Sequence, residues 1–257
     1  MLSGKNIVII GGTSGIGLAT AKAFKTYGAN VVIAGKPGSA EAIQDLGKDI
    51  SILEGDASDP SFSQKAIDTC VSKFQKLDGL YHVAGGSGRS AGDGPLHELT
   101  LEGWQKTFDL NLTSLMLSNQ ATIKQFLKQG NGGSILNMSS VLAISPAPHH
   151  FATHAYAAAK SAVLGFSKSI ASYYASKNIR VNVIAPALVD TPMATRAVGN
   201  ESIQSYIKTK QPLGGGRVSH PNDLTGLACY FMSDQSKFTT GQIVAVDGGW
   251  SITDGQL

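Results

Sequence analysis

Short apolar runs alternate along the chain with longer segments that have the apolar spacing of amphipathic helices. The run at 6–10 consists almost wholly of consecutive isoleucine and valine, as expected for a parallel strand buried on both faces. Similar runs predict further strands at 30–34, 50–53, 79–83, 133–138, 179–184 and 242–246. Helices are expected at about 18–27, 39–47, 60–76, 104–113, 154–176 and from 221. The alternation predicts an α/β fold in one domain, 1–257, with a doubly wound, mostly parallel seven-stranded sheet and helices on both faces.

The composition fits a protein that buries one sizeable core. The chain has 257 residues, 42% of them hydrophobic, and a mean hydropathy near zero. Its formal charge of +3 comes from scattered lysines and arginines without a basic run, so we expect neither a nucleic-acid partner nor a membrane-surface partner. No apolar run reaches the roughly eighteen residues that a membrane span needs.

The cysteines and the N-terminal residues indicate the cellular compartment in which the protein is expected. Cys70 and Cys229 lie far apart and have no metal-ligand pattern beside them, so we expect reduced, buried thiols and no zinc site. The residues before the first strand are too few for a signal peptide. Together these features predict a cytoplasmic protein.

A glycine-rich turn lies between the first strand and the first helix. Gly11, Gly15 and Gly17 follow the spacing Gly-x-x-x-Gly-x-Gly. Glycine here permits a tight turn, brings the backbone close to a pyrophosphate and packs the helix against the strand, while the helix N-terminus favours negative charge. The turn therefore predicts a dinucleotide site, with candidate contacts from Gly11, Thr13, Ser14, Gly15, Ile16 and Gly17.

The pair Tyr156 and Lys160 is the candidate catalytic centre. The alanines between them favour a helix, and four-residue spacing places the phenol and the ammonium on one face. Lowering a tyrosine pKa from about 10 to about 7 takes about 4 kcal/mol, roughly what one cation at about 4 Å supplies at an effective dielectric of about 20. Taken alone, such a pair also fits a half-buried ring beside a solvated charge.

The order of these motifs along the chain resembles the classical short-chain dehydrogenase/reductase family over essentially its whole length. The glycine-rich turn is followed by Asn111 within a helical segment, by a strand ending in Ser139-Ser140, and then by Tyr156 and Lys160. The resemblance implies a Rossmann fold and hydride transfer between a substrate carbon and NAD(P) without a metal.

The resemblance also implies roles for individual residues. Tyr156 would exchange the hydroxyl proton, and Lys160 would lower the pKa of Tyr156 and hold the nicotinamide ribose. Ser140 would bind the substrate oxygen. Asn111 would bend its helix and hold a water that relays protons to Lys160, although an ordinary polar helix residue is the alternative. Ala84 and Gly85, after the fourth strand, and Pro186, after the sixth, match further cofactor positions.

The chain departs from the family pattern at several of these positions. Ile10 stands where threonine usually precedes the first glycine, and Ala187 replaces the glycine after Pro186. His82 and Val83 replace two asparagines, and we expect His82 to be a packed strand residue rather than a catalytic one. About three extra residues separate Ser140 from Tyr156, and this insertion is expected to shape the pocket.

The residues after the second strand bear on the choice of cofactor. NAD-binding folds place an acidic residue there for the ribose 2′-hydroxyl, whereas this chain has Gly35-Lys36. Lys36 favours the 2′-phosphate of NADP, with NAD possible; Ser14 lacks the basic character that NADP-binding relatives often have in the turn. Asp56 is expected to contact adenine or to cap the next helix, and Thr191 to contact the nicotinamide carboxamide or to cap a helix.

Three segments are expected to border the substrate. The glycine-rich loop 85–95 has the most flexible character, and its Arg89 either meets a substrate carboxylate or phosphate or is simply solvated. His149, His150 and His154 fit a pocket or interface better than a metal site, because carboxylates are absent nearby. Residues 190–216 are expected to form a lid.

We therefore expect an NADP-dependent carbonyl reductase or alcohol dehydrogenase. By resemblance alone a 3-oxoacyl thioester is the first substrate class, and a sugar, a polyol or another small alcohol is the next. A non-catalytic NAD(P)-binding regulator is the alternative of another class, although such a protein would be expected to lack Tyr156, Lys160 or Ser140. The apolar terminal strand and Trp250 fit the subunit contacts of a homotetramer or homodimer, as is usual in the family.

Overall fold

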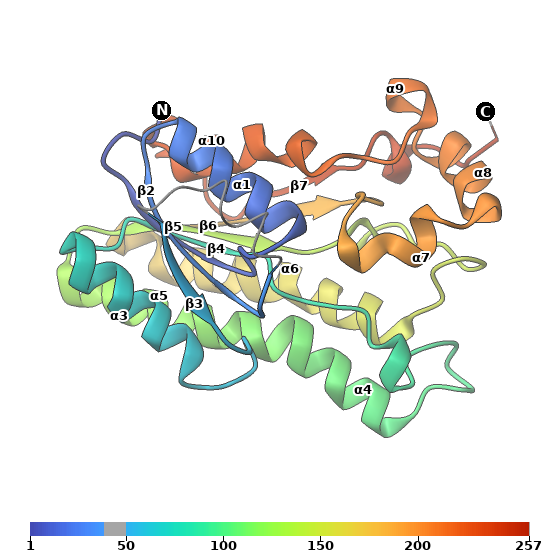
Figure 1. Cartoon of the computed structure of the whole chain (residues 1–257), viewed down its shortest axis with the longest axis horizontal. Coiled ribbons are helices and arrows are strands. Elements are labelled where there is room, and N and C mark those ends of the chain that lie inside the picture. The colour runs from blue at the N-terminus through green and yellow to red at the C-terminus, as the bar shows by residue number, and fades with distance from the viewer. Residues whose placement is uncertain (39–49, 257) are drawn as a thin grey trace.

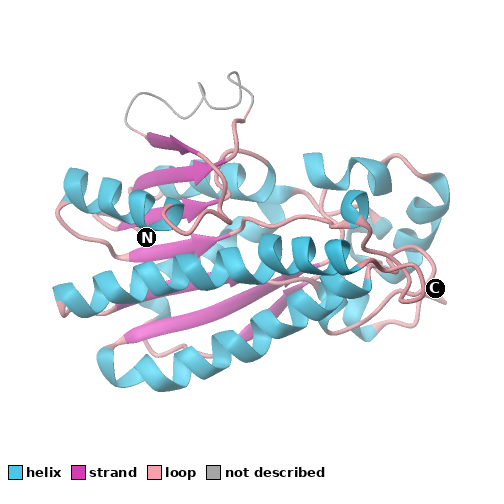
Figure 2. Ribbon diagram, turned by 90° about the horizontal axis from the view of Figure 1, so that it is seen from below, coloured by secondary structure: helices cyan, strands magenta, loops and turns pink. Residues whose placement is uncertain are grey.

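The computed structural model describes residues 1–38 and 50–256, so the helix expected at 39–47 lies outside the described part. Seven strands form one sheet in the order β3-β2-β1-β4-β5-β6-β7, and every neighbouring pair is parallel (Figure 2). The strands are β1 (Asn6–Ile10), β2 (Asn30–Gly35), β3 (Ser51–Glu54), β4 (Gly79–His82), β5 (Gly133–Met138), β6 (Ile179–Pro186) and β7 (Ile243–Val246). The predicted doubly wound α/β sheet is confirmed.

Helices cover both faces of this sheet (Figure 1). In Figure 1, α1 (Gly15–Thr26) and α10 (Thr225–Met232) lie on one side of the strands, and α3 (Phe62–Phe74), α5 (Ser114–Gln129) and α6 (His154–Tyr174) lie on the other. Neighbouring residues of one strand pack on opposite faces, because side chains alternate along a strand. Ile9 belongs to the core beneath α1 and α10, whereas Val8 belongs to the core beneath α3 and α5.

The central helical segment is interrupted beside the site. The helix expected at 104–113 is α4 (Leu101–Phe108) followed by a π-helical turn, η2 (Asp109–Thr113), and then by α5. A π-turn inserts one residue into the helical ladder and marks a bend or a functional site. Asn111 lies in this turn and is fully buried.

Several short elements gather at the carboxyl ends of the strands. After β6 the chain forms η5 (Pro192–Ala194), α7 (Thr195–Val198), α8 (Glu201–Lys210) and α9 (Leu213–Gly216), at one end of the molecule in Figure 1. Ile203 and Ile207 of α8 share a core cluster with Trp250 near the C-terminus. The Trp250 ring meets Phe151 and Tyr206 edge-on, with ring centroids 5.7 and 5.6 Å apart. The segment that the sequence predicts as a lid therefore packs on an aromatic cluster.

Two element boundaries differ from the sequence expectation in ways that affect the site. The first helix begins at Gly15 rather than at residue 18, because Ser14 is its N-cap and the last residues of the glycine turn are already helical. The segment from Pro221 begins as the 3₁₀ helix η6 (Pro221–Leu224) before α10. In the described part of the chain, no helix is both long and apolar enough to cross a membrane.

Candidate active site

A cleft of about 610 Å³ opens at the carboxyl ends of β1 and β4. The strand order reverses between these two strands, since β1 leads to β2 on one side while β4 and β5 follow on the other. Ligands of doubly wound sheets bind at such switch points. The cleft is lined by every predicted site residue except Gly17, that is by Gly11, Thr13, Ser14, Gly15, Ile16, Lys36, Asp56, Ala84, Gly85, Asn111, Ser140, Tyr156, Lys160, Pro186 and Thr191.

The glycine-rich turn leaves no room for side chains at two of its positions. Gly11 has φ +88°, and a Cβ there would lie 2.5 Å from the backbone nitrogen of Ala84. A Cβ at Gly17 would collide with the carbonyl oxygen of Gly11, so Gly17 packs α1 against the turn instead of lining the cleft. The result is an open backbone cradle at the N-terminus of α1, which fits a pyrophosphate group.

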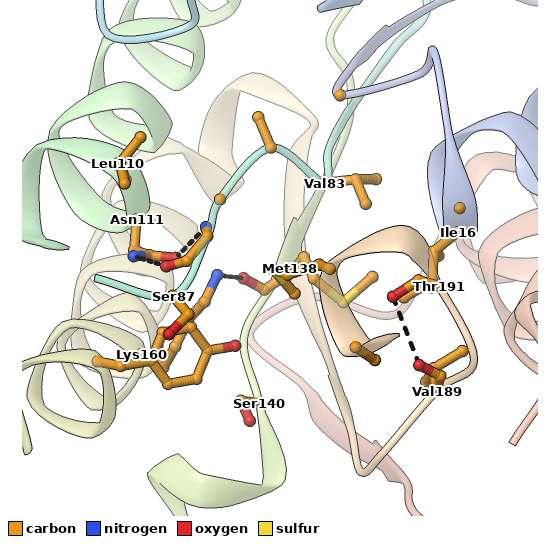
Figure 3. Close-up of a pocket in the computed structure, with 18 of the residues that line it drawn as sticks. Ile16, Val83, Ser87, Leu110, Asn111, Met138, Ser140, Lys160, Val189 and Thr191 are labelled. Carbon is orange, nitrogen blue, oxygen red and sulfur yellow. Dashed lines mark hydrogen bonds between the residues drawn. The ribbon is translucent and has the colours of Figure 1, made fainter. Parts of the chain in front are cut away.

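Lys160 and Tyr156 lie together on α6, facing the end of β5. The Lys160 Nζ donates a hydrogen bond to the carbonyl oxygen of Met138 at 3.1 Å and lies 5.7 Å from the centroid of the Tyr156 ring (Figure 3). The Ser139 hydroxyl donates to the Lys160 carbonyl oxygen at 2.7 Å, which ties the strand end to the helix. Ser140 is the next residue in the chain, and its Oγ accepts a hydrogen bond from the Leu142 amide at 3.2 Å.

Burial controls the protonation of both groups on α6. Burial raises the pKa of the Tyr156 phenol, and a hydrogen bond with Ser140 opposes that rise. Burial lowers the pKa of the Lys160 ammonium to about 8. The Lys160 ammonium is held on the Met138 carbonyl oxygen, and the pKa of Tyr156 is set first by burial, so the role of Lys160 in lowering that pKa stays a prediction.

Asn111 is held by three hydrogen bonds within the π-turn region. Its side-chain nitrogen donates to the carbonyl oxygens of Gly86 and Thr107, both at 2.8 Å, and its Oδ1 accepts from the Gly86 amide at 3.1 Å. Figure 3 shows this amide beside the β4 loop, with Lys160 close by. A side chain at Gly85 would lie 2.7 Å from the Asn111 Oδ1 and 3.2 Å from the Lys160 Nζ, so glycine keeps this space open.

Lys36 and Asp56 form an ion pair at the edge of the cleft. The Lys36 Nζ lies 3.2 Å from a carboxylate oxygen of Asp56, and the two side chains are 68% and 41% exposed. Asp56 also accepts hydrogen bonds from the Ser58 hydroxyl and amide, and these bonds, helped by Lys36, lower the pKa of Asp56 to about 2. Asp56 does not cap the following helix, whose N-cap is Ser61, so that alternative is wrong.

Thr191 lies across the cleft from Lys160, after β6 (Figure 3). Its hydroxyl donates to the Val189 carbonyl oxygen at 3.4 Å, and its side chain makes no capping hydrogen bond to the helix that follows (Figure 3). Thr191 is thus the N-cap residue of η5 (Pro192–Ala194) by its backbone alone, and it also lines the cleft. A Cβ at Gly15 would lie 3.1 Å from a methyl group of Thr191, so the glycine turn and the post-β6 loop meet here.

His82 is a packed strand residue. It is fully buried, its Nδ1 lies 2.8 Å from the Ser118 hydroxyl, and its Nε2 lies 3.5 Å from the Ser114 hydroxyl. Burial, followed by the nearby Lys160 charge, lowers its pKa to about 3. The imidazole is therefore neutral at physiological pH and joins β4 to α5.

Asp93 is a site residue that the sequence reasoning missed. Its two carboxylate oxygens accept hydrogen bonds from the amides of Ala155 and Tyr156, each at 3.0 Å, and the residue is 5% exposed. A carboxylate at a helix N-terminus satisfies free amides and complements the helix dipole. The signal in the sequence is weak, because Asp93 lies 63 positions from Tyr156 in a glycine-rich loop.

The insertion before Tyr156 borders the same cleft. Phe151 and Thr153 line it, and the His150 ring packs against Tyr206 with centroids 5.2 Å apart. Among the described residues, no group of three or more histidine, cysteine, aspartate or glutamate side chains is arranged to hold a metal ion. Of the three histidines, His150 is the one whose ring packs on the aromatic cluster in the described structure.

Comparison with known proteins gives the family. The family model described as Enoyl-(Acyl carrier protein) reductase matches residues 11–251. The chain is 34% identical over 254 residues to 2,5-dichloro-2,5-cyclohexadiene-1,4-diol dehydrogenase of Sphingobium indicum, covering 97% of this chain and 98% of that protein. It is 35% identical to the NADP-dependent (R)-specific alcohol dehydrogenase of Lentilactobacillus kefiri, with the same coverage.

A solved structure agrees with these relatives. The 3-ketoacyl-(acyl-carrier-protein) reductase of Brucella melitensis, complexed with NADH, superposes with a TM-score of 0.85 at 28% identity, covering 98% of this chain and 100% of that one. The cradle at the glycine turn and the Tyr156, Ser140 and Lys160 side chains lie in one cleft, as an NAD(P)-dependent reaction requires. The chain therefore belongs to the short-chain dehydrogenase/reductase family and is an oxidoreductase acting on CH–OH groups.

Proposed function

We propose that this enzyme interconverts a ketone and a secondary alcohol with NADP(H), using Tyr156 as the proton donor and acceptor. The observation that carries the proposal is the convergence of Tyr156, Ser140 and Lys160 on one cleft below the glycine cradle. When bound, the nicotinamide supplies the hydride in reduction or takes it up in oxidation. The chain's own residues then have to bind the oxygen of the substrate and move one proton.

Different side chains bind the substrate oxygen and transfer the proton. In reduction the Tyr156 hydroxyl gives its proton to the substrate oxygen as the C–H bond forms, and the Ser140 hydroxyl stabilises the charge on that oxygen. Burial raises the pKa of the Tyr156 phenol, so the phenol carries the proton that reduction needs. Lys160 supplies positive charge and hydrogen bonds beside the phenol, and Asn111 fixes the β4 loop behind Lys160.

The preference for NADP rests on the end of β2. Gly35 occupies the place of the usual acidic residue, and Lys36 follows it at the edge of the cleft. The Asp56 carboxylate neutralises part of the Lys36 charge, so we expect preference for NADP without strict exclusion of NAD.

Nucleotide titration tests this preference. Lys36→Ala should weaken NADPH binding about tenfold, the usual size of one charge-assisted contact, and NADH binding less than about twofold. Lys177→Gln, which removes an exposed charge from the distant η4 (Ala175–Lys177), is the control. Equal weakening of both nucleotides by Lys36→Ala would rule out the 2′-phosphate contact.

We propose a 3-oxoacyl thioester as the first substrate class. The Brucella melitensis 3-ketoacyl reductase supports it, and the description of the matching family model names another reductase of acyl-carrier-protein thioesters. A sugar, a polyol or another small alcohol is the second candidate, supported by the diol and alcohol dehydrogenases among the relatives. A panel of ketones from both classes with NADPH distinguishes them, since the preferred class should have the highest kcat/KM.

We also propose that the enzyme is a homotetramer, or else a homodimer. β7 is an edge strand of only partly buried residues, and Phe238 and Ile252 close to it in sequence are almost fully exposed. Apolar surface of this kind is usual where subunits meet. Sedimentation equilibrium should give a mass of four or two times 26.7 kDa, and a monomer at micromolar concentration would contradict the proposal.

We propose that the enzyme is located in the cytoplasm. Both cysteines, Cys70 and Cys229, are free and buried, which fits a reducing environment. Fractionation of the source cells should find the enzyme with cytoplasmic markers; recovery in an oxidising compartment would exclude the proposal.

A further inference from the structure

Two arginines from separate segments meet at the substrate side of the cleft. Arg89 comes from η1 (Arg89–Ala91) in the loop after β4, and Arg196 comes from α7 beyond β6. Both line the cleft, and each donates a guanidinium hydrogen bond to the His150 carbonyl oxygen, at 3.3 and 3.4 Å. A single acceptor shared by both side chains fixes them near each other.

In the part of the chain that the structure describes, no carboxylate is in direct contact with either guanidinium group. Among the described residues, neither arginine takes part in an ion pair, and Asp56, at the Lys36 end, is the one acidic residue that lines the cleft. Asp93 attracts Arg89 electrostatically, but its two carboxylate oxygens accept hydrogen bonds from the amides of α6 and not from the guanidinium. Burial and the Arg196 charge lower the pKa of Arg89, as expected for like charges held close together.

Apolar side chains near Arg89 and Arg196 complete a substrate-binding subsite. Leu142, Phe151 and Trp250 line the same cleft and offer apolar surface. They belong to one hydrophobic cluster with Ala197, which follows Arg196 in the sequence. Two unpaired guanidinium groups beside apolar side chains suit a molecule with a hydrocarbon body and an anionic oxygen group, since arginine binds carboxylate and phosphate through paired N–H donors.

We propose that Arg89 and Arg196 bind an anionic group of the substrate, whose carbonyl or hydroxyl oxygen exchanges a proton with Tyr156. This inference rests on the proposed function and specifies the substrate class. Two sources share the required chemistry: the carboxylate of a small oxo or hydroxy acid, and the phosphate of a pantetheine arm on an acyl thioester. The two arginines come from the segments after β4 and β6, whereas Lys36 follows β2, so different elements form the subsite and the site proposed for the 2′-phosphate.

Binding calorimetry on the NADP-loaded enzyme tests the subsite without requiring turnover. The probes are two matched pairs, cyclohexanecarboxylate with cyclohexanecarboxamide and 4′-phosphopantetheine with pantetheine. We expect the charged member of one pair to bind about tenfold tighter than its neutral partner, and the pair that shows this identifies the source. Arg89→Gln, Arg196→Gln and the double variant should reduce that ratio stepwise to below about twofold.

The controls separate a binding role from a structural one. Lys177→Gln should leave the ratio unchanged, and the affinity of the neutral ligands should be the same in every variant. Equal affinity for charged and neutral ligands in the wild-type enzyme, or a ratio that survives the double substitution, would overturn the proposal. Because no step of this test needs NADPH oxidation, an absence of turnover on ketones would refute the proposed function and leave the anion subsite to be judged by binding alone.

Discussion

At the scale of single residues, burial dominates the electrostatics of the site. Lys160 is 3% exposed as a residue, and its ammonium donates to the Met138 carbonyl oxygen, so its charged form loses much of its hydration. The neighbouring Tyr156 phenol stays neutral for the same reason. The positive charge of an oxidised nicotinamide would favour the phenolate, which makes the acidity of Tyr156 dependent on the cofactor.

The shifted pKa of Lys160 makes stability depend on pH. Its folded pKa of about 8 lies below the ordinary lysine value of 10.5, so between these values the unfolded chain binds more protons, and stability rises with pH. Relative to Lys160→Met, the wild-type enzyme should gain about 2 kcal/mol in free energy of unfolding from pH 7.5 to pH 10.

Urea denaturation of both proteins at the two pH values measures this gain. Tyrosines and cysteines titrate in both proteins, so their effects largely cancel in the difference. A difference that stays constant with pH would show that Lys160 keeps an ordinary pKa in the folded enzyme.

At the scale of elements, the N-terminus of α6 is tied to the β4–α4 loop. The loop was expected to be the most flexible part of the chain, yet its Asp93 carboxylate binds two amides of α6, and the Thr100 amide donates to the Gly92 carbonyl oxygen at 3.1 Å. Glycines in this loop permit close packing as well as turns: a side chain at Gly88 would collide with the Thr107 hydroxyl. Composition alone did not distinguish these two uses of glycine.

Asp93 is a positioning residue for Tyr156, and an amide in its place should disturb that role. Asp93→Asn keeps one acceptor oxygen but turns an NH₂ group toward a backbone amide, so we expect a loss of about 1 kcal/mol in unfolding free energy. We expect kcat to fall severalfold while the nucleotide Kd is unchanged.

Asp68→Asn, which removes the same charge from the exposed face of α3, is the matched control. Steady-state kinetics and denaturation on both variants provide the measurements. If Asp93→Asn lowers stability but leaves kcat at the wild-type value, Asp93 is a helix cap without influence on the chemistry.

At the scale of the whole molecule, local patterns predicted the sheet and the cleft. The apolar run of β1, the glycine cradle and the Tyr156–Lys160 spacing each depend on neighbours in the sequence, and all three are found where the sequence placed them. Strand order reverses at β1 and β4, which brings these local motifs to one switch point.

Contacts between segments that lie far apart in the chain could not be predicted from the sequence. The Lys36–Asp56 ion pair, the two serine contacts of His82 and the shared acceptor of Arg89 and Arg196 all join residues on different elements. The pKa of Tyr156 depends on burial, which is a property of the folded chain. A Coulomb estimate for an assumed separation of the phenol and the ammonium could not include it.

The most direct test of the enzyme's chemistry compares NADPH oxidation by the wild-type protein and by Tyr156→Phe across a ketone panel, with nucleotide affinity measured in parallel. We expect the wild-type enzyme to reduce at least one ketone, and the variant to lose about 10²- to 10⁴-fold in kcat, the contribution of a general acid, while NADPH binds within about twofold of the wild-type affinity. Turnover retained by Tyr156→Phe at the wild-type rate would contradict the account, because the proton would then come from another group.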